Sequence, residues 1–588
     1  MPDKTQGKAR IGEEDIRAAV TALMPEPLPF GEDDNLLELG LDSLRLMRLV
    51  AQWRKAGLKI AFADLVERPT LRAWLELAGL REAGGRAGAS GGTEGPDQPA
   101  ETGADAPAQK GADRTFPLTD LQHAYWIGRR SDQPLGGVGC HLYMELDALE
   151  LDPERMHRAW MLLLASHPML RLRVTADGRQ EIMPRGHAES FVLHDLREDS
   201  DPAVRLAELR EQLSRRVLPV EEGCVAGLAM SLLPHSRVRL HFDCDMLAAD
   251  ARGIAVMLRD LGAAYDTGAI PTARPDWDPA AWLAAQERER AGQEEEDRLY
   301  WQERIATLPP PPMLPKRVKP ETVRGQRVVR RSRLVPRSQV KTLQYKTAAL
   351  GATPALAMLT AYAETLARFS ESARFTLSLP VSGRESGHEA DDMVCDCTTL
   401  LLLEADCSEN RTFAESLRLM KGRLYEDMGH TSYSGVRVLR DLARLRPGAM
   451  PAGSVVFAGN LGSGLMNRRF GPLGSLAYAV SQTPQVWLDF QQYETEDGLL
   501  LVWDAADELF PEGLADSMFA AFGRLVEQIC ALEMNLDSEF DFCDLPANRA
   551  TSESLPALPE SLHGPFFRHA AEDPDRTALI LPDGSRLS

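Results

Sequence analysis

The segment from Arg81 to Arg114 divides this chain of 588 residues into parts that must fold separately. It is rich in glycine, alanine, proline and acidic residues, and it contains no aromatic side chain. Such a stretch cannot bury enough apolar surface to offset the chain entropy lost on ordering. We therefore assign residues 81–115 to a flexible linker between a small N-terminal unit and a much larger one.

The N-terminal unit, residues 12–80, has the pattern of a small helical domain. Helices are expected at Glu13–Met24, from Asp42 to about Ala56, and from Thr70 to about Leu80. One apolar stripe marks the second helix: Leu46, Met47, Val50 and Trp53.

The larger unit, residues 116–546, reads as mixed α/β. Pro309–Pro312 is too stiff for a helix or a central strand, so it predicts a connection between an N-lobe (about 116–300) and a C-lobe (about 301–546). The clearest predicted strands are Gln180–Met183 and Val238–Cys244, and the clearest helices are Glu154–Leu164, Arg252–Tyr265 and Pro354–Phe369.

Composition excludes some classes of function. With 66 basic and 87 acidic residues the net charge is −21, which argues against nucleic-acid binding. We expect no membrane span, and no secretion signal precedes the first helix, so a cytoplasmic protein is predicted. The eight cysteines lack zinc spacing, so we expect reduced thiols and no metal site.

Ser43 lies in Gly40-Leu41-Asp42-Ser43-Leu44, just ahead of the second predicted helix. This segment resembles the phosphopantetheine attachment site of carrier proteins in nonribosomal peptide synthetases. The resemblance implies a covalent 4'-phosphopantetheine on Ser43, at a helix N-terminus whose dipole favours a phosphate. An ordinary N-capping serine is the alternative.

Seven motifs in the larger unit resemble, in order, those of heterocyclization domains. They span nearly all of Phe116–Pro546. They are Phe116–Arg129, Ser166–Arg171, Asp245–Asp250, Leu379-Pro380 with Arg384, Asp396-Cys397-Thr398, Val455–Phe457 with Asn460–Gly462, and Ser481–Asp489. Together with Ser43 they resemble the aryl carrier and cyclization portion of the siderophore synthetases that make yersiniabactin and pyochelin.

The resemblance implies a multidomain fold: an all-α four-helix carrier, then an α/β domain of two chloramphenicol-acetyltransferase-like lobes with a tunnel between them. It implies that an aryl thioester, with salicyl as the expected aryl group, condenses with carrier-bound cysteine. The product then cyclizes and dehydrates to an aryl-thiazoline for siderophore synthesis. Residues 557–588 resemble the truncated start of an adenylation domain, to which we assign no activity.

The partners that the resemblance implies are enzymes and domains acting on the same tethered substrates. They are a stand-alone aryl-acid (salicylate) adenylating ligase, a phosphopantetheinyl transferase, and downstream peptidyl carrier and adenylation domains.

Met246 stands where ordinary condensation domains carry the histidine that handles the amine proton, and methionine cannot transfer a proton. Dehydration needs a proton donor and acceptor, which a carboxyl with a raised pKa can be. Asp489 is the first candidate because it follows an apolar run. Family members often place a threonine at the position of Ala458; here Thr483, Gln482 or water is expected to substitute.

Four further motif residues are expected to shape the site rather than to react. Asp245 and Asp250 are expected to bond an arginine or backbone amides, and Asp396 with Thr398 to hold a strand end. Gly253 stands at the family's serine position, and Cys397 and Phe490 also depart from the usual pattern. These departures leave a second hypothesis open, a chemically silent module that only positions carriers. Met246 disfavours a third, an acyltransferase with a histidine base.

Overall fold

The computed structural model describes residues 12–24, 29–37 and 68–79, scattered positions between 39 and 65, residues 115–538 except 187–189, 385–391 and 447–452, and two short C-terminal strands. The chain forms two compact units, Met1–Phe540 and Asp541–Ser588. In the second unit, β15 (Leu579–Ile580) pairs antiparallel with β16 (Arg586–Leu587).

The N-terminal region is helical, with α1 (Glu13–Leu23) and α4 (Leu71–Leu77) as predicted. Thr70 begins α4 because its hydroxyl accepts the Ala73 N–H at 3.2 Å. The buried core includes Ile16, Val20, Leu36, Leu46, Leu49, Trp53 and Trp74. Of the predicted second helix, residues 46, 49, 50 and 53 are helical, but Ser43 lies outside the described residues.

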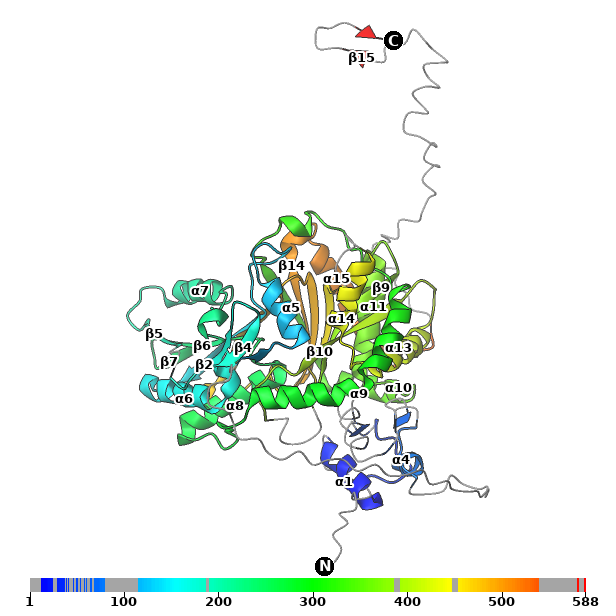
Figure 1. Cartoon of the computed structure of the whole chain (residues 1–588), viewed down its shortest axis with the longest axis horizontal. Helices are drawn as coiled ribbons and strands as arrows, with labels where there is room; N and C mark the ends of the chain where they lie inside the picture. Colours follow the sequence, from blue (N-terminus) through cyan, green and yellow to red (C-terminus); the bar gives the residue numbers. More distant parts are fainter. Residues whose placement is uncertain are drawn as a thin grey trace, which may run out of the picture. The chain divides into compact units, whose positions relative to one another are not determined.

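The first lobe contains a five-stranded sheet in the order β12-β2-β7-β6-β5. Its strands from this half of the chain are β2 (His141–Leu149), β5 (Phe191–Asp195), β6 (Ala226–Leu232) and β7 (Arg237–Asp245). Helices α6 (Pro153–Ser166) and α8 (Ala251–Thr267) cover its apolar face, and α7 (Pro202–Leu213) lies over the other (Figure 1). A small sheet joins β1 (Phe116–Pro117), β4 (Arg179–Ile182) and β3 (Leu172–Val174).

The second lobe is built on a six-stranded sheet in the order β10-β9-β11-β13-β14-β8. These strands are β8 (Val328–Pro336), β9 (Arg374–Ser382), β10 (Thr398–Asp406), β11 (Val455–Gly459), β13 (Leu488–Thr495) and β14 (Gly498–Ala506). The α-helices of this lobe that the structure describes are α10 (Arg337–Ala348), α11 (Pro354–Phe369), α13 (Phe413–Met428), α14 (Gly435–Leu445) and α15 (Leu514–Cys530). Figure 1 shows α14, together with α5 (Asp120–Gly128), in front of this sheet, and the long α9 (Pro279–Ile305) running below both lobes.

Strand β12 (Ser475–Gln482) belongs to the C-terminal half of the chain but pairs with β2 of the first sheet. The pairing is antiparallel, with Gln482 opposite His141. The predicted boundary near residue 300 assigns residues 475–482 to the C-lobe, but this strand belongs to the sheet of the first lobe. The crossing carries the end of β12, and the loop after it, to the junction between the two large sheets.

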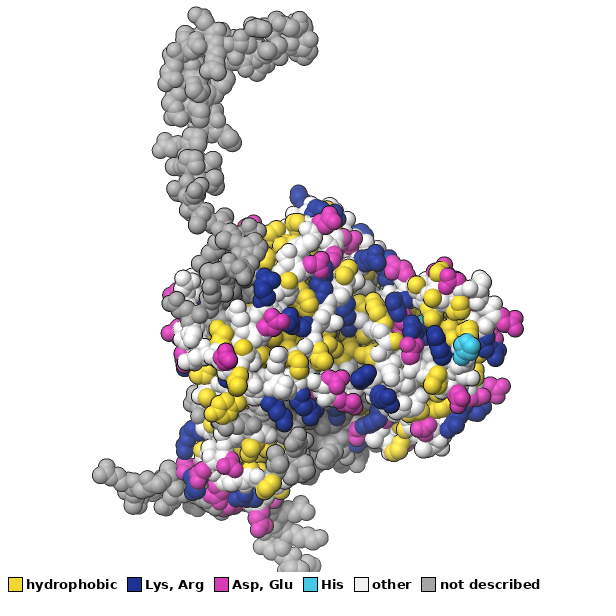
Figure 2. Space-filling model, turned by 180° about the vertical axis from the view of Figure 1, so that it is seen from behind, with side chains coloured by type: hydrophobic (Ala, Val, Ile, Leu, Met, Phe, Trp, Pro, Cys, Tyr) yellow, Lys and Arg dark blue, Asp and Glu magenta, His cyan; other side chains and the backbone are white. Residues whose placement is uncertain are grey.

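The predicted helices and strands of the larger unit are confirmed. Helix α11 begins at Pro354, preceded by the capping side chain of Thr353. The proline run falls in the connection between α9 and β8. Acidic and basic side chains are interspersed over the described part of the face in Figure 2. Within the part of the chain that the structure describes, no helix is both long and apolar enough to cross a membrane.

Candidate active site

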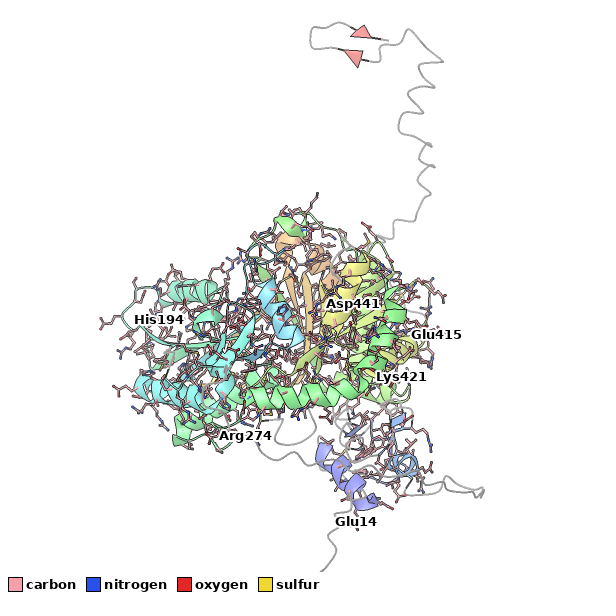
Figure 3. The ribbon with its side chains drawn as sticks, viewed as in Figure 1. Glu14, His194, Arg274, Glu415, Lys421 and Asp441 are labelled. Carbon is pink, nitrogen blue, oxygen red and sulfur yellow. The ribbon has the colours of Figure 1, made fainter. Side chains whose placement is uncertain are left out.

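A cavity of about 630 Å³ lies between the lobes. We call it the central cavity; this volume is typical of a small-molecule site. Its walls come from α5, the segment 246–251, strands β9, β10, β11 and β13, the loop 483–486, and α14, the helix that Figure 3 marks with Asp441. Both halves of the larger unit therefore contribute walls to one cavity.

The alternation of β13 directs Asp489 into this space. Leu488 and Phe490 are fully buried on the opposite face, where the ring of Phe490 lies 5.1 Å from that of Tyr362 on α11. Asp489, Gln491 and Tyr493 instead line the central cavity, because successive side chains of a strand point to opposite faces.

The Asp489 carboxyl has two unlike oxygens. Oδ2 accepts a hydrogen bond from Gln491 Nε2 at 2.6 Å, whereas Oδ1 is buried and without a hydrogen-bond partner in the structure. Burial and the neighbouring Asp504 raise the pKa of Asp489 to about 7, against the opposing effect of Gln491 and Arg330. Near neutral pH this group can therefore both give and take a proton.

Thr483 and Gln482 lie in different environments. Thr483 lines the central cavity, and its Oγ1 lies 3.7 Å from Cys140 Sγ. Gln482 is buried, is not among the lining residues, and its Nε2 has no hydrogen-bond partner among the described atoms. Ala458 lines the cavity on β11 and carries no hydroxyl, whereas Thr483, in the loop after β12, brings a hydroxyl to the cavity wall.

The paired aspartates make the contacts expected from their residue types. Asp250 caps α8, accepting the Gly253 N–H at 2.7 Å, and both its oxygens bind the Arg384 guanidinium. Asp245 accepts the Leu247 N–H at 3.1 Å and lies 3.4 Å from Arg129. Asp250 borders the central cavity but its oxygens are occupied, which favours a structural role.

Asp396 has one feature that its residue type alone does not predict. Its Oδ1 accepts the Thr398 N–H at 3.0 Å, as a residue at the start of a strand does, but its buried Oδ2 has no hydrogen-bond partner in the described structure. Both residues line the central cavity. Burial and the charge of Asp250 raise the pKa of Asp396 to about 7, so the cavity holds a second carboxyl that can be neutral.

Met246 also lines the central cavity, so no imidazole stands at that position. Nearby Cys395 is buried, and the neighbouring Cys397 together with burial raises the pKa of its thiol well above the ordinary value. A neutral thiol is a poor nucleophile and metal ligand. Among the residues with described positions, no group of three or more histidine, cysteine or acidic side chains could hold a metal ion.

The sequence of this chain matches two known protein families. Residues 112–542 match the condensation domain family, and residues 14–78 match the phosphopantetheine attachment site family. The chain belongs to the condensation domain family. It combines a carrier domain, the kind that holds 4'-phosphopantetheine, with a condensation/cyclization domain of a nonribosomal peptide synthetase.

Two named relatives are similar to nearly the whole of this chain. The chain is 36% identical over 585 residues to phenyloxazoline synthase MbtB of Mycobacterium sp. (strain MCS), covering 97% of this chain and 48% of MbtB. It is 36% identical over 579 residues to pyochelin synthetase PchE of Pseudomonas aeruginosa (strain UCBPP-PA14), covering 95% of this chain and 39% of PchE. The chain thus spans less than half of either relative.

Solved structures confirm the predicted chloramphenicol-acetyltransferase-like fold of the larger unit, and the family match above places a carrier domain before it. The EpoB cyclization-docking bidomain from Sorangium cellulosum matches with a TM-score of 0.65 and 29% identity, covering 72% of this chain and 85% of that one. The first condensation domain of the calcium-dependent antibiotic synthetase, at 22% identity and a TM-score of 0.57, shares the fold, covering 72% of this chain and 98% of that one.

Proposed function

We propose that this protein joins an aryl group, held as a thioester on its own carrier domain, to a carrier-bound cysteine and closes the product to an aryl-thiazoline for siderophore synthesis. One observation supports the ring-closing step most strongly. A carboxyl with a pKa of about 7, Asp489, faces a cavity between the lobes, and one of its oxygens has no hydrogen-bond partner among the described residues.

The first step is amide formation. The amine of the cysteine attacks the thioester carbonyl carbon, the carbon–sulfur bond breaks, and the departing thiolate takes the proton that the amine loses and leaves as a thiol. Because Met246 replaces a base at the cavity wall, this step relies on positioning of the two substrates rather than on a proton acceptor at that residue.

The second step closes the ring and removes water. The cysteine sulfur attacks the new amide carbonyl, whose oxygen takes the thiol proton to become a hydroxyl. Neutral Asp489 then protonates this hydroxyl, which leaves as water, and the resulting carboxylate takes the proton from nitrogen. Asp489 returns to its neutral form, and the product has lost one molecule of water. Thr483 supplies the hydroxyl that hydrogen-bonds the departing oxygen.

For the carrier, we propose that Ser43 bears the phosphopantetheine arm and that the domain, residues 12–80, is separated by the 81–115 linker from a cyclization domain at 116–546. A salicylate-activating ligase and a phosphopantetheinyl transferase would act on it in the cytoplasm, and downstream carrier and adenylation domains would receive the product. The buried helical core around Leu46 and Trp53 supports such a domain.

Intact-mass measurement tests the carrier assignment. The 588-residue chain incubated with coenzyme A and a phosphopantetheinyl transferase should gain one phosphopantetheine, and the Ser43→Ala chain should gain none. Equal gain by both chains would remove Ser43 as the attachment site without touching the cyclization proposal.

The ring-closing proposal is tested with the salicyl-loaded chain and cysteine presented as its thioester on a carrier. Mass spectrometry should find salicyl-cysteine that has lost one water. A condensed product that retains the water would remove the cyclization claim, and the absence of any condensed product would favour a silent, carrier-positioning module.

A hydroxyl amino acid is the second candidate substrate, because MbtB is named a phenyloxazoline synthase. An oxazoline ring forms when a hydroxyl rather than a thiol attacks the amide carbonyl. Parallel reactions with cysteinyl, seryl and threonyl thioesters decide between the two rings, and we expect the cysteinyl substrate to react fastest.

A further inference from the structure

Gln491 lies between Asp489 and the crossing strand β12. Its Nε2 is 2.6 Å from Asp489 Oδ2 and 2.7 Å from Ser481 Oγ, and its Oε1 accepts the Tyr493 hydroxyl at 2.6 Å. Oε1 also accepts from Arg330 Nη2 at 3.5 Å, so the amide nitrogen and oxygen are both fully engaged and the side chain has a single well-defined position.

The orientation of this amide follows from the next contact. The Ser481 hydroxyl donates to Asp504 Oδ2 at 2.8 Å, so its oxygen can only accept from Gln491. An amide turned the other way would place its carbonyl against that occupied oxygen. Nε2 must face Ser481 and Asp489, and Asp489 Oδ2 must be a hydrogen-bond acceptor.

Asp504 is in turn held by Arg330. The guanidinium Nε lies 2.8 Å from Asp504 Oδ1, and its Nη2 lies 2.5 Å from Oδ2. Sheet register aligns the three residues: Asp489 on β13 is opposite Asp504 on β14, which is opposite Arg330 on β8. Asp504, held in place by Arg330, therefore fixes the direction in which the Ser481 hydroxyl donates.

We propose that Gln491 is a positioning residue that places the acidic proton of Asp489 on Oδ1, the oxygen without a partner. A carboxyl oxygen that accepts an N–H cannot at the same time direct its own proton along that line. The neutral carboxyl thus presents its O–H away from Gln491, and the proposed function, on which this inference rests, needs such a donor at the departing hydroxyl.

The charged and titratable groups near Asp489 come from five elements. They are Asp504 on β14, Arg330 on β8, Tyr493 on β13, Tyr125 on α5 and Tyr362 on α11. The tyrosines have raised pKa values and stay neutral, so Gln491, Asp504 and Arg330 set the ionisation of Asp489. The Gln491 hydrogen bond lowers the pKa of Asp489, so losing it raises that pKa.

The test separates the rates of condensation and cyclization in the 588-residue chain loaded with salicylate, across pH, with cysteinyl thioester as acceptor. For Gln491→Leu we expect condensation to stay within about threefold, the maximal cyclization rate to fall about tenfold, and its decline at alkaline pH to begin at higher pH. For Tyr493→Phe, which removes the hydrogen bond to Gln491 Oε1 and so holds the amide less firmly, we expect a smaller fall of cyclization alone. Gln293→Glu on the surface of α9 is the matched control and should change neither rate.

Several outcomes would overturn this proposal. Cyclization by Gln491→Leu at the normal rate with an unshifted alkaline limb would do so, and so would equal losses in both steps, which indicate a purely structural role. If Gln491→Leu does not fold, Tyr493→Phe decides, and an unchanged cyclization rate in that variant overturns the proposal. A wild-type chain that condenses without cyclizing would instead remove the proposed function itself.

Discussion

Asp489 and Asp504 lie directly opposite each other on β13 and β14, but Arg330 forms a bidentate pair with Asp504, while Asp489 Oδ1 has no partner among the described residues. The two neighbouring carboxyls thus have different partners. Arg330 binds both oxygens of Asp504, and burial together with the charge of Asp504 raises the pKa of Asp489 to about 7. An acid whose pKa is raised in this way can serve as a proton donor near neutral pH.

Replacing Asp504 with asparagine should move the pH dependence of cyclization. The change removes a negative charge that raises the pKa of Asp489 and leaves Arg330 unpaired, and both effects lower that pKa. Because the neutral acid is the active form, the alkaline decline in rate should begin at lower pH. Breaking this buried pair should also cost about 3–5 kcal/mol in the free energy of unfolding, measured by urea denaturation. An unshifted rate profile would contradict the electrostatic link.

Arg384→Met should destabilise the protein without selecting between the two reaction steps. The side chain of Arg384 is only 4% exposed and binds both oxygens of Asp250, so its loss leaves a largely buried carboxylate unpaired. We expect a loss of about 3–5 kcal/mol in unfolding free energy and equal falls in condensation and cyclization. A selective loss of cyclization with unchanged stability would instead assign Asp250 a chemical role.

Met246→Leu should leave condensation within about threefold of the wild-type rate, because the two side chains have similar volume and neither transfers a proton. Single-turnover amide formation measures this. A loss of a hundredfold or more would show that the sulfur of Met246 takes part in the step.

His241 should make the first lobe sensitive to acid. It is buried between Tyr143, 2.8 Å from Nδ1, and Ser231, 3.0 Å from Nε2, and burial lowers its pKa to about 4. In the unfolded chain the imidazole of His241 takes up a proton near pH 6.5. Folding is therefore fully stable, with respect to this group, above about pH 6.5. As the pH falls towards 4, the free energy of unfolding drops by about 3 kcal/mol. His241→Gln should reduce the slope of unfolding free energy against pH in this range, and an unchanged slope would contradict the assignment.

Local sequence signals predicted much of the fold because they act over short distances. The pattern of Pro354–Phe369 indicated α11, and the alternation of Val238 to Cys244 indicated β7. The pairing of β12 with β2 was not predictable in this way, since no local pattern specifies which distant strand a segment will join.

The residues of the candidate site also fall into those that the sequence indicated and those that it did not. The ordered motifs indicated Asp489 and Thr483, and both line the central cavity, whereas Gln482 does not. Gln491 and Tyr493 were missed, although polar residues two apart after Asp489 were a readable sign of one strand face. Arg330 and Asp504 could not be found from sequence, because their contact with Ser481 depends on the register of three strands and on the crossing of β12. The unpartnered oxygen of Asp396 also emerges only from the packing around it.

The most direct measurement is the product distribution of the Asp489→Asn chain, loaded with salicylate and given cysteinyl thioester, followed by mass spectrometry. Asp147→Asn, a half-exposed side chain on β2, is the matched control. The account predicts that Asp489→Asn condenses within about threefold of wild type but cyclizes and dehydrates at least about a hundredfold more slowly, so that the uncyclized amide accumulates. Dehydrated product formed at the wild-type rate by Asp489→Asn would contradict it.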